Sequence, residues 1–293
     1  MKPLDPKRMA GIIGALALAL ALSACSAIKL GYSNLPHLAY WWLDNYVDFS
    51  DEQEPLVRDE LERLYTWHRK QELPRILELV SRVEQLAGGD VTPEQACAIF
   101  EDGRARFRAL AEQAEPAAAT VAASLTGREH THLARKFRRA NDKFQREWVA
   151  LGRADLVDKR HKQMTDRLET FYGRLDERQQ AVLRQRLEHS MFEPARSLVE
   201  WDRRQQDLLQ LLRRMSQPGA PTAETRALLH AWIERLEKSP DPTHRAYQEA
   251  LVKEGCTTFA VVHQSTTAAQ RDQAARRLRA YERDLRDLMA PAT

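Results

Sequence analysis

The sequence contains little glycine, proline or cysteine: 11, 13 and 3 residues of 293, respectively. Ala, Leu, Arg, Glu and Gln are abundant instead, and these residues favour helices. Catalytic signatures are also lacking, since no glycine-rich phosphate loop, Gly-x-Ser-x-Gly elbow or zincin motif occurs. The composition therefore predicts an all-α protein, and we expect a protein that is not an enzyme and has no cofactor.

A strong charge of either sign is missing as well. The formal net charge is +3, and Lys2, Lys7 and Arg8 at the amino terminus account for much of it. Without the first 24 residues the chain is nearly neutral, so its overall charge gives no reason to expect nucleic acid as a partner. We expect none.

The only long apolar run, Met9 to Leu22, follows the three amino-terminal cations and precedes Ser23-Ala24-Cys25. A positive start, an apolar run and a small-residue end are typical of a secretory signal peptide. A spanning helix needs about 20 apolar residues, and this run is shorter. We predict a cleaved signal peptide over residues 1–24. An uncleaved membrane anchor and a secreted form without lipid are the alternatives.

The end of this segment, Leu22-Ser23-Ala24-Cys25, resembles the lipobox read by the bacterial lipoprotein signal peptidase. The resemblance implies cleavage before Cys25, a diacylglycerol thioether on its sulfur and an acyl chain on its new amino group. More than one acyl chain gives stable anchoring to a membrane. Ser26, where an aspartate would favour inner-membrane retention, suggests the outer membrane of a Gram-negative bacterium. We expect a periplasm-facing lipoprotein with a tether over residues 25–35.

Two cysteines remain once Cys25 carries lipid: Cys97 and Cys256. Disulfides form in oxidising compartments such as the periplasm, and an even number of cysteines suits pairing. We therefore predict a Cys97–Cys256 disulfide. Two separate buried thiols, each acting as a small apolar side chain, are the alternative.

From Asp51 onward, apolar residues recur at helical spacing nearly throughout the chain. We predict a multi-helix bundle of about ten helices, with a kink at Pro74 and loops over 216–221 and 239–242. Residues 257–262 have the composition of a strand, but their apolar spacing favours helix. The first loop divides the expected bundle into an N-terminal part, 36–216, and a C-terminal part, 221–293, packed on it.

A helix-start pattern recurs five times: Ser, Thr or Asp followed three residues later by Gln or Glu. In such a capping box the first side chain accepts a hydrogen bond from the fourth residue's N–H, and the fourth side chain bonds back. The pattern therefore predicts that five helices start with the first residue of such a box as the N-cap. These five residues are Ser50, Thr92, Thr126, Asp176 and Thr267.

The aromatic segment Leu38 to Val47 contains Tyr40, Trp41, Trp42 and Tyr46. It could lie at lipid headgroups, where Trp and Tyr are enriched. Because aromatic side chains chiefly supply buried area, we expect instead that this helix packs in the core.

Two resemblances concern longer stretches. Tyr32 to Asp48, Leu64 to Pro74, Arg203 to Leu209 and Gln270 to Arg286 resemble a family of uncharacterised proteobacterial outer-membrane lipoproteins. This resemblance implies a helical lipoprotein and transfers no site residues. Leu175 to Gln179 and Thr267 to Gln270 are weakly similar to the Leu-Thr-x-x-Gln motifs of small helical periplasmic chaperones, although helix capping alone explains the spacing.

Two pairs of residues, each containing histidine, are candidate chemical sites. His130 and His132 are two apart, whereas helical metal ligands are three or four apart, so we expect surface histidines and no metal. His68 and Glu72 are four apart and could touch as a polar pair or general base. No nucleophile or oxyanion donor accompanies them.

A base-rich stretch, Arg128 to Arg146, flanks the apolar stripe of one expected helix. An exposed helix surface explains it simply, while a contact with anionic groups is possible because Arg pairs well with phosphate. The candidate residues for that contact are Arg135, Lys136, Arg138, Arg139 and Lys143.

Three hypotheses about function follow. The first is a binding or chaperone-like module for envelope proteins, held near the membrane by lipid. The second is a structural or accessory subunit of an outer-membrane complex with one fixed partner. The third is an enzyme acting on envelope polymers, centred on His68 and Glu72. We predict the first.

Overall fold

The computed structural model describes residues 28–217 and 222–290, and within them it contains helices and no strand. A short helical stretch, 28–33, precedes eleven α-helices and two π-helical segments. The predicted all-α bundle of about ten helices is confirmed. The elements are α2 (Leu35–Val47), α3 (Glu54–Trp67), η1 (His68–Glu72), α4 (Leu73–Ala87), α5 (Pro93–Ser124), α6 (Gly127–Phe144), η2 (Gln145–Val149), α7 (Arg153–Tyr172), α8 (Glu177–Glu188), α9 (Pro194–Met215), α10 (Thr222–Glu237), α11 (Pro242–Ser265) and α12 (Ala268–Met289).

Four of the five predicted capping boxes start helices. Thr92, Thr126, Asp176 and Thr267 are the N-caps of α5, α6, α8 and α12, each with a reciprocal Gln or Glu. The prediction at Ser50 is wrong. There the Gln53 side chain bonds back to the Ser50 N–H, but residues 51–53 form a turn and α3 begins at Glu54.

The expected break at Pro74 takes the form of a π-helical turn. Segment η1 lies between α3 and α4, and Pro74 lies in the first turn of α4. Proline has no N–H for the preceding helical turn, and π-helical turns accommodate such irregularities. Residues 54–87 therefore form one continuous helical rod, in which the π-helical turn η1 interrupts the α-helical hydrogen-bond pattern. Residues 257–262 lie inside α11, as predicted.

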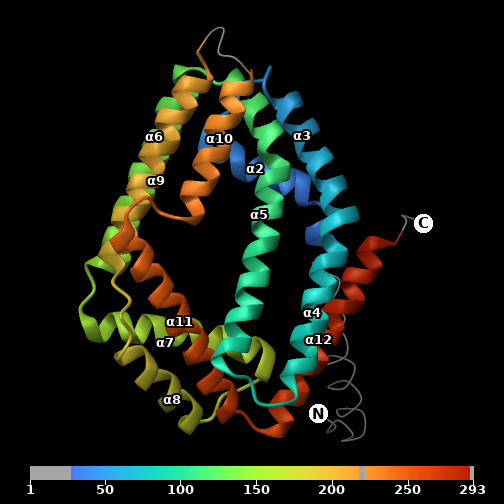
Figure 1. Ribbon diagram of the computed structural model, residues 1–293, viewed down its shortest axis with the longest axis vertical. Helices are drawn as coiled ribbons and strands as arrows, with labels where there is room; N and C mark the ends of the chain where they lie inside the picture. Colours follow the sequence, from blue (N-terminus) through green and yellow to red (C-terminus); the bar gives the residue numbers. More distant parts are fainter. Residues whose placement is uncertain (1–27, 218–221, 291–293) are drawn as a thin grey trace, which may run out of the picture.

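The helices form an elongated bundle in which α5 runs along most of the length (Figure 1). The rod α3–η1–α4 lies on one side with α12 against α4, and α6 and α9 lie together on the other. Helix α2 packs on α3 and α6, α10 on α5 and α9, and α11 on α5 and α8. Helices from the last quarter of the chain thus contact helices from α4 to α9.

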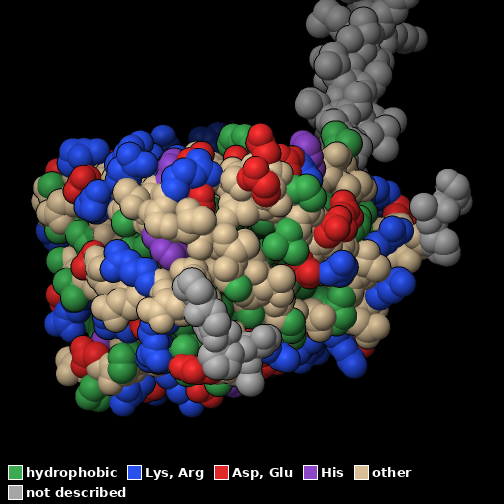
Figure 2. All heavy atoms as spheres, turned by 90° about the horizontal axis from the view of Figure 1, so that it is seen from above, with side chains coloured by type: hydrophobic (Ala, Val, Ile, Leu, Met, Phe, Trp, Pro, Cys, Tyr) green, Lys and Arg blue, Asp and Glu red, His purple; other side chains and the backbone are tan. Residues whose placement is uncertain are grey.

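The buried core is divided among three clusters. One joins α5, α9 and α10 around Met215, a second joins α7, α8 and α11 around Leu183, and a third joins α7 and α12 around Leu175. The end of the bundle viewed in Figure 2 carries basic and acidic side chains with scattered apolar ones between them. Burial of apolar area inside these clusters is the main force that holds the helices together.

Two sequence expectations about burial are wrong. Helix α2 does not pack in the core with its tryptophans, because Trp41 and Trp42 are 68% and 56% exposed and Tyr40 is the buried aromatic residue. His130 is not a surface histidine either. It is buried, with Nε2 3.5 Å from the Ser216 hydroxyl at the end of α9. Both outcomes depend on which neighbouring helix covers each face.

Candidate functional site

Cys97 on α5 and Cys256 on α11 are joined by a disulfide, with their Cα atoms 5.3 Å apart. Cys256 lines one cavity and Cys97 lines a second, so the bridge lies between the two. Phe100, Gln248 and Val252 line both cavities. The disulfide therefore fixes the two helices that form the shared wall.

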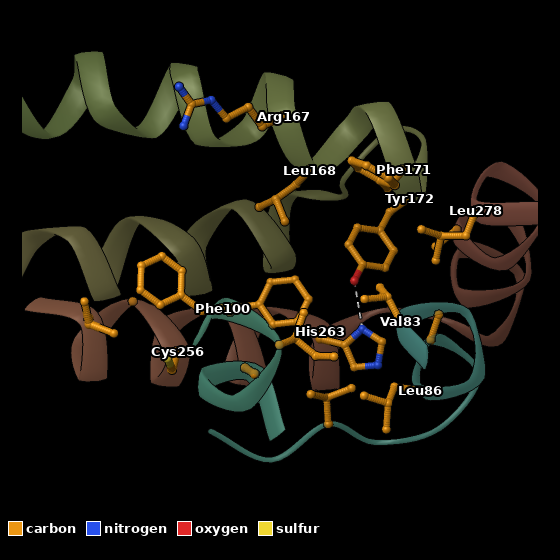
Figure 3. Close-up of a pocket in the computed structure, with 18 of the residues that line it drawn as sticks. Val83, Leu86, Phe100, Arg167, Leu168, Phe171, Tyr172, Cys256, His263 and Leu278 are labelled. Atoms are coloured by element: carbon orange, nitrogen blue, oxygen red, sulfur yellow. Dashed lines mark hydrogen bonds between the residues drawn. The ribbon is translucent and has the colours of Figure 1, made fainter. Parts of the chain in front are cut away.

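The first of these, the apolar cavity, has a volume of about 750 Å³. Such a volume is typical of small-ligand sites, which range over about 300–1,000 Å³. Five helices contribute to its lining: α4, α5, α7, α11 and α12. Aliphatic and aromatic side chains make up most of the lining, including Val83, Leu86, Phe100, Leu168 and Phe171 (Figure 3). The cavity suits an apolar occupant.

Two of the four polar side chains in this lining form a hydrogen bond with each other. The Tyr172 hydroxyl lies 2.8 Å from His263 Nδ1, and His263 Nε2 lies 2.7 Å from the Gly89 carbonyl (Figure 3). Because a carbonyl only accepts, Nε2 carries the proton, and Nδ1 accepts from the tyrosine. This chain of bonds joins α7 and α11 to the turn after α4.

Burial shifts the pKa values of His263 and Tyr172 away from neutral pH. Burial lowers the pKa of His263, against the opposing effect of its bond to Gly89, and burial raises the pKa of Tyr172 to about 12. His263 therefore stays neutral and Tyr172 stays protonated at neutral pH. The pair is suited to holding the helices in place, and it offers no free base to a ligand.

The other two polar side chains are Arg167 and Gln248. Arg167 is exposed on α7, where its side chain runs along the helix at the edge of the group drawn in Figure 3. No described residue forms an ion pair with it. Among the described residues, Arg167 is thus a cation without an ion-pair partner beside a mostly apolar lining.

The second cavity, here the charged cavity, has a volume of about 820 Å³ and lies between α5, α10 and α11. It adds Phe107 to the shared Phe100, so two exposed aromatic rings lie along the α5 wall. Its remaining lining includes charges of both signs: Glu101, Arg104, Glu237, Lys238, Arg245, Glu249 and Lys253.

The structure does not bring His68 and Glu72 together as a catalytic pair. His68 Nδ1 lies 2.9 Å from the Tyr32 hydroxyl, whereas buried Glu72 forms an ion pair with Arg106 at 3.4 Å. Both residues lie in η1, whose wider turn does not stack residues four apart as an α-helix does. Each side chain is engaged with a different element.

The remaining sequence candidates lie apart from the cavities. On α6, Arg135, Arg138, Arg139 and Lys143 are exposed, and Lys136 donates a hydrogen bond to Asn45 of α2 at 2.7 Å. His132 Nδ1 lies 3.7 Å from the Asp48 carboxylate. Among residues 28–217 and 222–290, no cluster of three or more His, Cys, Asp or Glu side chains is placed to bind a metal ion. Cys25 lies outside the described residues.

None of the described helices has both the length and the apolar character needed to cross a bilayer.

Sequence reasoning missed the apolar cavity. Val83, Cys256, Phe259 and His263 stand out in the sequence only as residues at helical spacing, which any core-facing stripe shows. The cavity results from the way α5 and α7 pack against α11 and α12, and no local motif specifies that packing.

Fold and cavity together define an all-α bundle protein with an apolar cavity between its helices. The chain belongs to a family of unknown function, DUF6279, whose model matches residues 45–239. The match contains α3 to α10 and ends before α11 and α12, which supply nine of the 20 residues that line the apolar cavity. No curated protein matches the chain, and no solved structure does.

Titration of His263 gives a first prediction. An unfolded imidazole, with its ordinary pKa of 6.5, takes up a proton below that pH, while the folded one resists it because its pKa is lowered. The contribution of neutral His263 is therefore complete above pH 6.5 and is lost as the pH falls toward the lowered value. We expect His263→Gln to lose less stability between pH 7 and pH 5 than the native chain, measured by urea unfolding.

Tyr172→Phe is the matched control. It removes the hydrogen bond to Nδ1, worth roughly 1 kcal/mol, but keeps the titrating imidazole. It should be less stable at both pH values and should keep the native dependence on pH. If His263→Gln shows the same dependence as the native chain, His263 is not buried in its neutral form.

Proposed function

We propose that this protein is a non-enzymatic binding module of the cell envelope that holds apolar segments of envelope proteins. It is anchored to the outer membrane by lipid on Cys25 and faces the periplasm. The observation that carries the binding function is the apolar cavity of about 750 Å³, which adjoins a second cavity lined by charges of both signs. The lipobox-like end of the leader supports the location.

The chemistry of the two cavities favours a polypeptide as the occupant. A polypeptide presents apolar side chains together with charges of either sign, and the two linings offer the complement of both. Phe100, which belongs to both linings, connects the apolar region to the charged one. A single acyl chain would use the apolar cavity and leave most of the charged cavity empty.

The state of the polar groups favours binding over catalysis. His263 and Tyr172 are bonded to each other, and His68 and Glu72 are each bonded elsewhere. The first pair is occupied by its own hydrogen bonds, and His68 and Glu72 line neither cavity. This supports a protein that binds its partner without altering it covalently.

Photocrosslinking in intact cells tests the proposal. Phe100 of the lipidated, full chain is replaced by the photoreactive p-benzoyl-phenylalanine, and adducts are identified by mass spectrometry. Trp201 is the matched control position, since it is also a helical aromatic residue and is 43% exposed against 46% for Phe100. We expect several envelope proteins to be captured from position 100 and few from position 201.

A cavity-filling substitution sharpens the result. Gly255 lines the apolar cavity, and a Cβ added there meets no atom within 4 Å. Gly255→Phe should therefore occupy the cavity and abolish most adducts without unfolding α11, since most residues favour a helix over glycine by up to about 1 kcal/mol. Gly127→Phe, which has the same open surroundings and lines neither cavity, should leave the adducts unchanged.

The alternatives give distinct outcomes. If a single dominant partner is captured from position 100, the protein is a subunit of one complex and not a chaperone-like module. Adducts with lipid alone would identify an acyl ligand beside Arg167. Equal capture from positions 100 and 201, or adducts that survive Gly255→Phe, would refute the cavity as the binding site.

A further inference from the structure

Exposed apolar side chains concentrate near the start of the described chain. Six of the twelve large hydrophobic side chains that are exposed in the described residues lie between positions 28 and 42. On α2 they recur at positions 35, 38, 41 and 42, which lie on one face of a helix. The six residues are Ile28, Leu30, Leu35, Leu38, Trp41 and Trp42, and those from 35 to 42 are called here the α2 apolar face.

Helix α6 lies beside this face and brings basic side chains to it. Tyr46 of α2 packs against Phe137 of α6, with ring centroids 6.5 Å apart, and Lys136 donates a hydrogen bond to Asn45. Asn45 is four residues after Trp41, so it lies on the same side of α2 as the apolar face. The basic surface of α6 therefore starts at the edge of the α2 apolar face.

Three cations on α6 have no carboxylate within ion-pairing distance among the described residues. Arg135, Arg138 and Arg139 are exposed, and no ion pair joins any of them to another described residue. Arg139 lies one turn beyond Lys136, so the basic strip continues along α6 away from α2. Unpaired arginines at a surface are free to bind phosphate, which matches their planar hydrogen-bonding fork.

Exposed tryptophans next to unpaired basic side chains are suited to contact the headgroup region of a membrane. Tryptophan side chains favour the headgroup region, where the apolar ring reaches the acyl boundary and the indole N–H stays hydrated. Basic side chains next to them are attracted to anionic headgroups. A protein partner would bury the tryptophans equally well, but it would not require a strip of unpaired cations beside them.

We propose that the α2 apolar face, together with Arg135, Arg138 and Arg139, rests on an anionic phospholipid bilayer and orients the bundle there. This contact is separate from the lipid proposed on Cys25 and does not depend on it. If Cys25 is lipidated, α2 begins only ten residues later, so an extended chain of about 35 Å is the longest possible separation. The attachment then restricts the surfaces that can face the bilayer to those near α2.

Vesicle binding by the chain without lipid tests the contact. Residues 26–293 contain every described residue, and they are mixed with vesicles of phosphatidylethanolamine and phosphatidylglycerol or of phosphatidylcholine alone. We expect flotation with the anionic vesicles, weakening with salt, and little with the neutral ones. Trp41→Ser with Trp42→Ser should reduce the partition coefficient by about tenfold or more, because both rings leave the interface. Each arginine replaced by Gln should reduce it about fivefold.

Matched controls exclude a general loss of apolar surface. Phe107→Ser and Val199→Ser remove exposed apolar side chains from α5 and α9 and should bind vesicles as the native chain does. Gly255→Phe should also bind normally, which separates this contact from occupancy of the apolar cavity. Circular dichroism of each variant confirms that its helices are retained.

A second measurement uses the lipidated, full chain inserted in vesicles. Phospholipids brominated on the acyl chains quench tryptophans at the interface, and the native chain should be quenched. The Trp41→Phe, Trp42→Phe variant, which retains four other tryptophans, should not be. The proposal is overturned if the native chain without lipid fails to float with anionic vesicles, if the serine variant floats equally well, or if quenching persists without Trp41 and Trp42.

Discussion

Removal of the Cys97–Cys256 disulfide is expected to lower the free energy of unfolding by up to about 5 kcal/mol, the largest single effect we predict. The two cysteines are 159 residues apart, so the bridge closes a loop of more than half the chain. In the chain-entropy model, such a loop restricts the unfolded state strongly. The bridge also joins α5 to α11, which form the wall between the two cavities. Its loss should loosen that wall.

The measurements are urea unfolding and thermal unfolding of the Cys97→Ser, Cys256→Ser variant beside the native chain, each with and without a reductant. We expect the midpoint of thermal unfolding to fall by roughly 10 °C or more. The reductant should bring the native chain to the stability of the variant and leave the variant unchanged. Equal unfolding midpoints for both oxidised proteins would show that the bridge contributes nothing. Photoadducts from position 100 should also decrease in the variant, because α5 and α11 no longer hold their spacing.

The structure shows which kinds of information the sequence carries. Capping boxes at Thr92, Thr126, Asp176 and Thr267 predict helix starts correctly because each depends on four consecutive residues. Ser50 has the same pattern, but no helix begins directly after it. A turn follows it, and α3 begins only where Pro55 occupies the first helical turn.

Errors arise where burial depends on distant segments. The exposure of Trp41 and Trp42 follows from the side of α2 that α3 and α6 cover, and no property of residues 35–47 specifies that side. His130 is buried by contact with Ser216, 86 positions away. The apolar cavity likewise requires α4, α5, α7, α11 and α12 to meet. Local patterns predict helices well, and the site is a property of their packing.

The second large effect is expected at Glu200, an almost fully buried carboxylate on α9. Arg203 binds it through two nitrogens at 2.8 and 2.9 Å, Arg204 binds it at 2.8 Å, and the buried Ser239 hydroxyl lies 3.2 Å away. Burial by itself would raise the pKa of Glu200, but hydrogen bonds from the two arginines outweigh it and lower the pKa to about 2. The carboxylate thus ties the loop after α10 to the middle of α9.

Replacing Glu200 with Gln should lower the free energy of unfolding by about 3 kcal/mol at neutral pH. The pKa difference between the ordinary 4.5 and about 2 corresponds to a stabilisation of that size. Breaking a buried ion pair has a comparable cost, because it leaves cations without a partner. Arg204 Nη2 is already buried without a hydrogen bond, so the loss of Glu200 would leave that guanidinium almost wholly unpaired.

The dependence on pH tests this origin of the effect. Glu200 stabilises the fold fully above pH 4.5, and this contribution is lost as the pH falls toward 2, since the folded carboxylate is then protonated as well. The stability difference between the native chain and Glu200→Gln should therefore shrink over that window. Glu78→Gln, which breaks the exposed Arg75–Glu78 pair on α4, is the matched control and should cost less than about 1 kcal/mol.

A second substitution separates charge from packing. Adding Arg204→Met to Glu200→Gln removes the orphaned cation while keeping a long apolar side chain, so it should restore part of the lost stability. If it restores nothing, the cost of Glu200→Gln lies in the bond to Ser239 and the loop after α10. If Glu200→Gln costs no more than Glu78→Gln, the buried carboxylate does not hold α9 and that loop together.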